Sequence, residues 1–92
     1  MDLNRWPHLE LLLETARRLP SLQVWLFGSA ARSKTPADLD ILLVYEDRSS
    51  VVALRAMQPW EDFCPPCHLI AMTPLEVAEY DFIVTTEATR LL

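Results

Sequence analysis

Apolar residues recur along this chain with two different periods, and the changes of period divide it into helices and strands. From Leu3 to Leu19, apolar residues that include Trp6 and Ala16 recur at helical spacing, with Asn4 as a candidate cap, Pro7 in the first turn and Pro20 at the end, which predicts a helix. Residues 22–27, LQVWLF, form a short apolar and aromatic run that is typical of a buried strand. The chain therefore begins with a helix followed by a strand.

A turn of small residues ends this strand. Gly28 and Ser29 follow it at once, and we expect a short helix over residues 29–33. Glycine accepts a positive φ at little cost and lets a ligand approach the backbone, while the first N–H groups of a helix have no partners within it. Phosphate is therefore the expected ligand of the turn.

Residues 37–45, ADLDILLVY, predict a second strand with two aspartates at its start. Residues two apart on a strand point to the same face, roughly 7 Å from each other, so Asp38 and Asp40 converge. After Asp40, the residues that point to either face of the strand are all apolar, which indicates a central strand buried on both faces. Since Mg²⁺ is bound by one or two carboxylates together with substrate phosphates, the aspartates predict a magnesium site beside the turn.

The rest of the chain continues the alternation of helix and strand. Ser49 or Ser50 can cap a helix that Pro59 ends, and residues 67–72, CHLIAM, predict a third strand. A last helix has its cap, first-turn proline and capping-box acid at Thr73, Pro74 and Glu76. Helices that alternate with three strands predict an α/β (α+β) fold, with a small three-stranded mixed sheet packed against helices.

Composition indicates one domain over residues 1–92 and excludes some partners. Hydrophobic residues make up 51% of the chain, enough for a core. The net charge of −5, with only 8 Lys and Arg, disfavours a long nucleic acid. No apolar run approaches the ~18 residues of a membrane span, and the N-terminus has no signal pattern, so we expect a cytoplasmic protein without membrane contact.

The Gly-Ser turn and the aspartates together resemble a known signature. Gly28-Ser29, a gap of eight residues and then Asp38-Leu39-Asp40 among apolar residues resemble the hG[GS]…DhDh pattern of the polymerase-beta-like nucleotidyltransferases. The GSxAR form of residues 28–32 is most similar to the small prokaryotic members called minimal nucleotidyltransferases, and the likeness extends over nearly the whole chain. Two positions differ: Ser33 replaces the usual glycine, and His68 is the best match for the family's third carboxylate.

The resemblance implies an activity and a role for each site residue. The activity is transfer of a nucleotidyl group, most often AMP from ATP, to an acceptor hydroxyl, with pyrophosphate leaving. Ser29 and the N–H groups after Gly28 would hold the β- and γ-phosphates of the nucleoside triphosphate, and Asp38 and Asp40 would hold Mg²⁺. In the family, the third carboxylate helps to bind a second metal ion that activates the attacking hydroxyl. Here that role is either vacant or taken by His68, which could act as a general base or as a poor Mg²⁺ ligand.

The resemblance also implies a partner and a helical tail. Small members are commonly paired with a HEPN-domain toxin, which they neutralise by adding AMP, so the chain is expected to be the antitoxin enzyme of such a pair. The alternative is a catalytically degenerate relative that neutralises its partner by binding alone. Either class needs a partner or a homodimer. The family's tail is helical, so we expect a helix broken near Asp81, although residues 82–86, FIVTT, have strand-like composition.

Four residues keep more than one interpretation. Arg32 either clamps a phosphate or lies on the surface, and His68 is either functional or a partly buried histidine. Cys64 and Cys67 lie in a CPPCH motif that is shared by haem, zinc and redox sites. We favour two reduced cysteines, one in a loop and one on a strand, because haem attachment needs export and zinc would lack a second pair of ligands.

Overall fold

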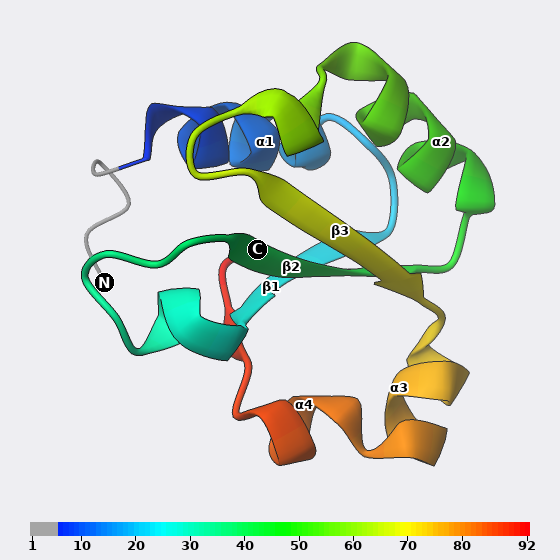
Figure 1. Cartoon of the computed structure of the whole chain (residues 1–92). Helices are drawn as coiled ribbons and strands as arrows, with labels where there is room; N and C mark the ends of the chain where they lie inside the picture. Colours follow the sequence, from blue (N-terminus) through cyan, green and yellow to red (C-terminus); the bar gives the residue numbers. More distant parts are fainter. Residues whose placement is uncertain (1–5) are drawn as a thin grey trace.

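The sheet that carries the aspartates has four strands in the order β3-β2-β1-β4 (Figure 1). The computed structural model describes residues 6–92. β1 (Leu22–Phe27) runs antiparallel to β2 (Leu39–Tyr45) and to the short β4 (Thr89–Arg90), whereas β3 (Cys67–Met72) runs parallel to β2. The mixed α/β class is confirmed. The sheet gains a fourth strand beyond the expected three, and the second strand begins at Leu39 instead of residue 37.

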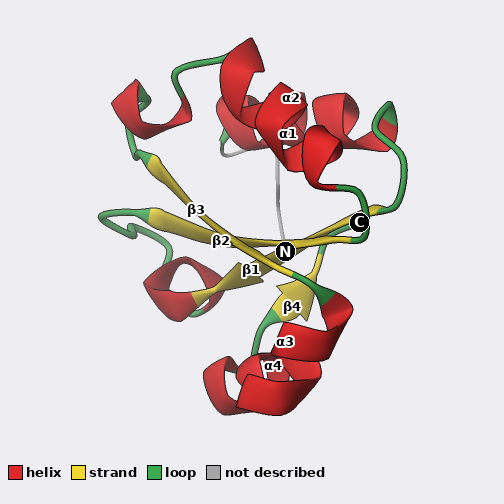
Figure 2. Cartoon of the chain, turned by 90° about the vertical axis from the view of Figure 1, so that its right-hand side faces the viewer, coloured by secondary structure: helices red, strands yellow, loops and turns green. Residues whose placement is uncertain are grey.

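Helices lie on both faces of the sheet (Figure 2). α1 (Pro7–Arg17) and α2 (Arg48–Met57) cover one face, and α3 (Pro74–Tyr80) and α4 (Phe82–Thr86) lie against the other. Two 3₁₀ turns, η2 (Gly28–Ala31) and η3 (Trp60–Asp62), stand between elements. Asn4, the expected cap of α1, lies outside the described residues. Within residues 6–92, no helix combines the length and the apolar character that crossing a membrane requires.

The main core lies between the sheet and the pair α1 and α2. Alternate residues of β1 are buried, as the period of a strand requires. Fully buried side chains from both layers meet there: Leu9, Leu12, Leu26, Ile41, Leu43 and Leu54. Complete burial of such a side chain contributes about 1.5–3 kcal/mol, so this layer supplies most of the stability of the fold.

The opposite face of the sheet carries the aspartates. Asp40 and Leu42 are two residues apart on β2, so their side chains point to the same face. Leu42 is fully buried on this face, on the side of α3 and α4, so β2 is covered on both faces, as expected. Phe27 at the end of β1 packs edge-on against Phe82 of α4, with 5.0 Å between ring centroids. Because Phe27 is also the partner of Asp40 across the strands, α4 lies close to the end of the sheet where β2 begins.

α2 begins earlier than the sequence indicates. Its cap is Asp47, and the carboxylate accepts hydrogen bonds from the Ser49 hydroxyl and N–H, at 2.6 and 3.0 Å, which lower the pKa of Asp47. Ser50 is buried instead, and its hydroxyl donates to the Pro20 carbonyl at 2.9 Å. The expectation of a cap at Ser49 or Ser50 was therefore wrong, because an aspartate two residues upstream competes for the same N–H.

The C-terminal part agrees with the expected helices up to residue 86. The Thr73–Glu76 capping box is present in both directions, at 3.2 and 3.0 Å. The helical tail is broken at Asp81, which adopts the left-handed conformation between α3 and α4. After α4 comes β4, which pairs with β1 at Trp25 and Leu26 and was not expected.

Candidate functional site

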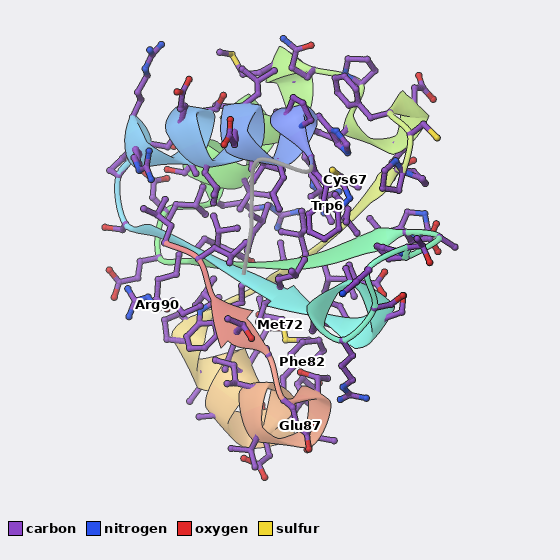
Figure 3. The ribbon with its side chains drawn as sticks, turned by 90° about the vertical axis from the view of Figure 1, so that its left-hand side faces the viewer. Trp6, Cys67, Met72, Phe82, Glu87 and Arg90 are labelled. Carbon is purple, nitrogen blue, oxygen red and sulfur yellow. The ribbon has the colours of Figure 1, made fainter. Side chains whose placement is uncertain are left out.

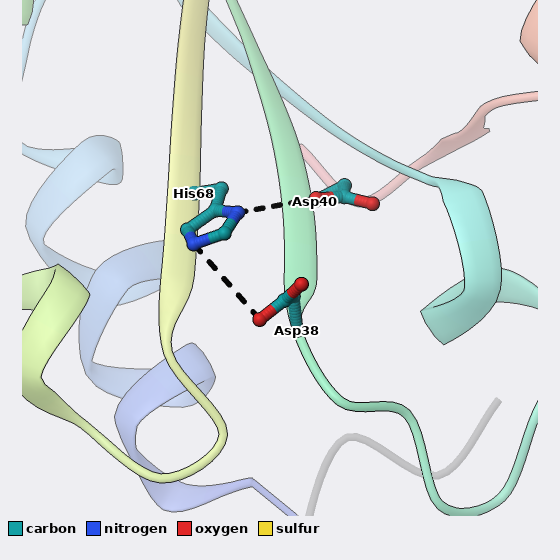
Figure 4. A group of neighbouring side chains, drawn as sticks. All are labelled: Asp38, Asp40 and His68. Atoms are coloured by element: carbon teal, nitrogen blue, oxygen red, sulfur yellow. Dashed lines mark ion pairs between the residues drawn. The ribbon is translucent and has the colours of Figure 1, made fainter.

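β2 places the two aspartates at one end of the sheet (Figure 4). Asp38 immediately precedes the strand and Asp40 is its second residue, so alternation directs both side chains to the same face. Their side chains are 41% and 30% exposed, which leaves both carboxylates accessible to a ligand from solvent. The convergence expected from the sequence is therefore present.

β3 adds His68 to this pair. The parallel register of β2 and β3 sets His68 directly beside Asp40. Nδ1 of the imidazole lies 3.7 Å from Asp40 Oδ1, and Nε2 lies 3.9 Å from Asp38 Oδ1 (Figure 4). His68 thus lies on the third strand in sequence, and its ring spans both carboxylates.

The three side chains form a group that could hold a metal ion. One donor atom from each of Asp38, Asp40 and His68 lies within 4.8 Å of the other two. Opposite ligands of one ion at ~2.1 Å lie about 4.2 Å apart, so small side-chain rotations bring all three donors into range. Two carboxylates suit a divalent cation, and the imidazole adds a nitrogen donor that later transition metals accept more readily than Mg²⁺ does.

The Gly-Ser turn lies directly against this group. Gly28 has φ +72°, in the left-handed region. A β-carbon at this position would overlap Asp40 Oδ2 and lie 3.2 Å from Asp40 Cγ. Glycine is therefore required at position 28 for two reasons, namely the backbone conformation and the space that the Asp40 carboxylate occupies.

The turn itself is shorter than the helix expected over residues 29–33. It is one 3₁₀ turn over Gly28–Ala31, in which the Ser29 carbonyl accepts the N–H groups of Arg32 and Ser33 at 3.0 and 2.7 Å. Ser29 itself is exposed. The Ser29 hydroxyl is thus available to solvent on a turn whose first residue touches a candidate metal ligand.

Arg32 contacts the end of α4. Its guanidinium forms an ion pair with Glu87 at 3.1 Å and donates to the Thr86 carbonyl at 3.4 Å. Both charged side chains are largely exposed. Sequence reasoning did not identify Glu87, because the residues are 55 positions apart and no periodic pattern connects them.

Of the CPPCH residues only His68 belongs to the metal group; Cys64 and Cys67 lie outside it, and both are free. Cys64 is in a loop and Cys67 is on β3, as expected, and burial raises the pKa of the Cys67 thiol to about 11. Cys67 lies on the α1 side of the sheet near Trp6 (Figure 3). His8 stacks on Phe63 with 5.1 Å between ring centroids, and its Nε2 bonds to the backbone of the same loop. His8 therefore has a packing role.

Comparison of the chain with models of known protein families, with curated proteins and with solved structures gave no match.

Proposed function

We propose that this chain is a nucleotidyltransferase that transfers AMP from Mg-ATP to a protein hydroxyl, as the minimal nucleotidyltransferases do. The observation that supports this most is the contact between the Gly-Ser turn and the metal group, at Gly28 and Asp40. The signature residues are separated in sequence, and they adjoin at one end of the sheet. A phosphate turn beside two carboxylates is the arrangement that a metal-bound triphosphate needs.

Each site residue has a defined task in the proposed reaction. Ser29 and the N–H groups after Gly28 bind the β- and γ-phosphates and orient pyrophosphate as the leaving group. Mg²⁺ held by Asp38 and Asp40 would offset the charge that develops at the α-phosphorus and on the leaving oxygen. His68 has two available roles, as proton acceptor for the attacking hydroxyl or as a nitrogen ligand. The hydroxyl oxygen forms the new bond to phosphorus as the bond to pyrophosphate breaks.

A protein is the acceptor that best fits this surface. The net charge of −5 disfavours nucleic acid. Three large apolar side chains on α3 and α4, on the same side of the sheet as the metal group, are exposed: Leu75, Tyr80 and Val84. Exposed apolar groups on the side of the sheet that carries the metal group are available for contact with another protein. We therefore propose a HEPN-domain toxin as the partner and acceptor, which makes this chain its antitoxin.

One observation favours a second candidate, a module that neutralises the same partner by binding alone. The position beside Asp40 where the family has its third carboxylate holds an imidazole. A relative without that acid can lose transfer and retain the surface that contacts the partner.

Label transfer from α-labelled ATP tests both candidates. The chain is incubated with Mg²⁺, labelled ATP and the protein encoded by the neighbouring gene. We expect label on that protein, lost with Asp40→Asn and retained with Glu14→Gln, which removes an exposed carboxylate on the opposite face of the sheet. In calorimetry, Asp40→Asn should abolish the metal-dependent part of ATP binding.

Two results would contradict this proposal, the first its metal site and the second its enzymatic activity. Transfer that survives loss of both aspartates would exclude Asp38 and Asp40 as the metal ligands. No transfer from the wild type, together with inhibition of the partner that survives the same double change, would establish the binding module instead.

A further inference from the structure

The metal group contains a donor that a magnesium site does not need. Asp38 and Asp40 alone would supply the one or two carboxylates that Mg²⁺ takes from a protein, with water and phosphate oxygens completing its six positions. His68 lies within 3.9 Å of both. It brings a nitrogen to a place where a hard cation gains little from one.

We propose that Asp38, Asp40 and His68 bind a divalent first-row transition ion such as Mn²⁺, Co²⁺ or Zn²⁺ in preference to Mg²⁺, with one imidazole nitrogen as a direct ligand. This assigns His68 the ligand role and not that of the base. The inference rests on the metal group of the proposed function, but its test needs neither nucleotide nor transfer, so the two can fail separately.

The chemistry of the donors supports this preference. Imidazole is a good ligand for the later divalent ions, whose affinity for nitrogen and oxygen sites rises from Mn²⁺ to Cu²⁺, and Zn²⁺ also binds it well. Mg²⁺ dehydrates reluctantly and prefers oxygen. A transition ion therefore gains a third protein ligand from His68, and Mg²⁺ does not. His68 should therefore raise the ratio of the affinity for a transition ion to the affinity for Mg²⁺ above the ratio that two carboxylates alone would give.

The geometry also supports direct ligation. Asp40 and His68 are paired on adjacent strands, so their backbones are held about 4.8 Å apart by the sheet. The Gly28 turn borders the Asp40 carboxylate and limits its movement. Donors on rigid elements hold a metal more accurately than donors on loops do. The imidazole side chain is 52% exposed, so water or substrate can take the remaining positions on the ion.

Only one nitrogen of the ring can bind the ion that the carboxylates share. Nδ1 faces Asp40 and Nε2 faces Asp38. When one nitrogen ligates, the other stays free to hydrogen-bond to water or to the other carboxylate. A carboxylate or water behind a metal-bound histidine orients the ring and strengthens the ligand.

The test is equilibrium binding of Co²⁺, Mn²⁺ and Mg²⁺ without nucleotide. Calorimetry measures the affinity for each ion, and visible absorption reports the ligands of bound Co²⁺. Cys64→Ser is used as the common background, so that the exposed thiol does not compete for the ion. His68→Ala removes the nitrogen, and His68→Asp replaces it with oxygen. His8→Gln is the control for the second histidine, because the amide can still donate to the loop that His8 Nε2 contacts.

We expect His68→Ala to weaken Co²⁺ binding by about 10–100-fold, the range seen when groups around a metal site are lost, with little change for Mg²⁺. His68→Asp should lower the Co²⁺ to Mg²⁺ affinity ratio by about tenfold or more. The Co²⁺ absorption should change in both variants and stay as in the wild type with His8→Gln. Because His68 is half exposed, both variants are expected to fold.

Two results would overturn the inference. The first is a Co²⁺ to Mg²⁺ affinity ratio that is the same in the wild type and in His68→Ala. The second is a Co²⁺ spectrum that His68→Ala leaves unchanged. Either result could coexist with Mg²⁺-dependent label transfer, in which case the proposed function would stand and only the ligand role of His68 would fall.

Discussion

Replacing Gly28 with alanine should damage the metal group as well as the fold. The new β-carbon would overlap Asp40 Oδ2 and lie 3.2 Å from Asp40 Cγ, so the carboxylate has to move. Alanine also has to adopt φ +72°, which an L-residue does at a cost. A single methyl group therefore tests whether the turn and the carboxylate are packed against each other.

The magnitude follows from these two costs. The left-handed conformation costs alanine about 1–2 kcal/mol, and forcing Asp40 away from its rotamer costs about 0.5–1.5 kcal/mol more. The sum of about 2–3 kcal/mol corresponds to a Tm lowered by on the order of 10–20 °C in a domain of this size. Displacing one of three donors should weaken metal binding by about tenfold or more.

Urea unfolding and metal calorimetry on a double-mutant cycle separate the two costs. In an Asp40→Ala background the carboxylate is absent, so Gly28→Ala should cost only the conformational part, about 1–2 kcal/mol. Ser29→Ala, at the exposed next position, is the control and should leave both stability and metal affinity close to the wild type. If Gly28→Ala cost the same in both backgrounds, or kept wild-type metal affinity, the contact between Gly28 and Asp40 would not hold the carboxylate in place.

Four further predictions concern other parts of the chain. Glu87→Gln breaks an exposed ion pair, so Tm should change by only a few degrees, while the freed Arg32 should strengthen ATP binding about two- to threefold in calorimetry; unchanged ATP affinity would exclude Arg32 as a phosphate ligand. A thiol reagent at pH 8 should modify Cys64 rapidly and Cys67 only upon unfolding. Because the folded pKa of Cys67 is raised to about 11, the unfolded chain loses its proton first, and the free energy of unfolding should fall as pH rises from 9 toward 11. Thr73→Ala removes the capping box of α3 and should cost about 1 kcal/mol, measured by urea unfolding; no loss would mean that α3 is capped by other groups.

The strands of the site could be predicted because each is a continuous apolar run between strong boundary residues. β1 ends before Gly28 and β3 ends before the Thr73 cap, and both have the bounds that the sequence indicates. The convergence of Asp38 and Asp40 follows from the period of a strand and needs no knowledge of the tertiary fold. These features depend on local rules, which a single sequence contains.

The features that the sequence did not indicate depend on contacts between distant segments. β4 has two residues, too few to show a period, and it is a strand only because Trp25 and Leu26 offer a free edge. The ion pair between Arg32 and Glu87 likewise joins the turn after β1 to the end of α4. The helix expected after Gly28 is limited to one turn because the chain has to return beside β1, where Phe27 pairs with Asp40.

The position of His68 depends on which residues of β3 face the core. Cys67 is fully buried on the α1 side, and Leu69 packs against the same core, so alternation turns His68 and Met72 to the face of the aspartates (Figure 3). A slip of one residue would reverse every side chain, burying the imidazole and moving the thiol beside Asp40. Burial of an imidazole without a partner costs more than burial of a thiol, which behaves as a small hydrophobe. The buried cysteine of the CPPCH motif therefore stabilises the register in which His68 meets the two carboxylates, and it contributes to the metal group without being a ligand.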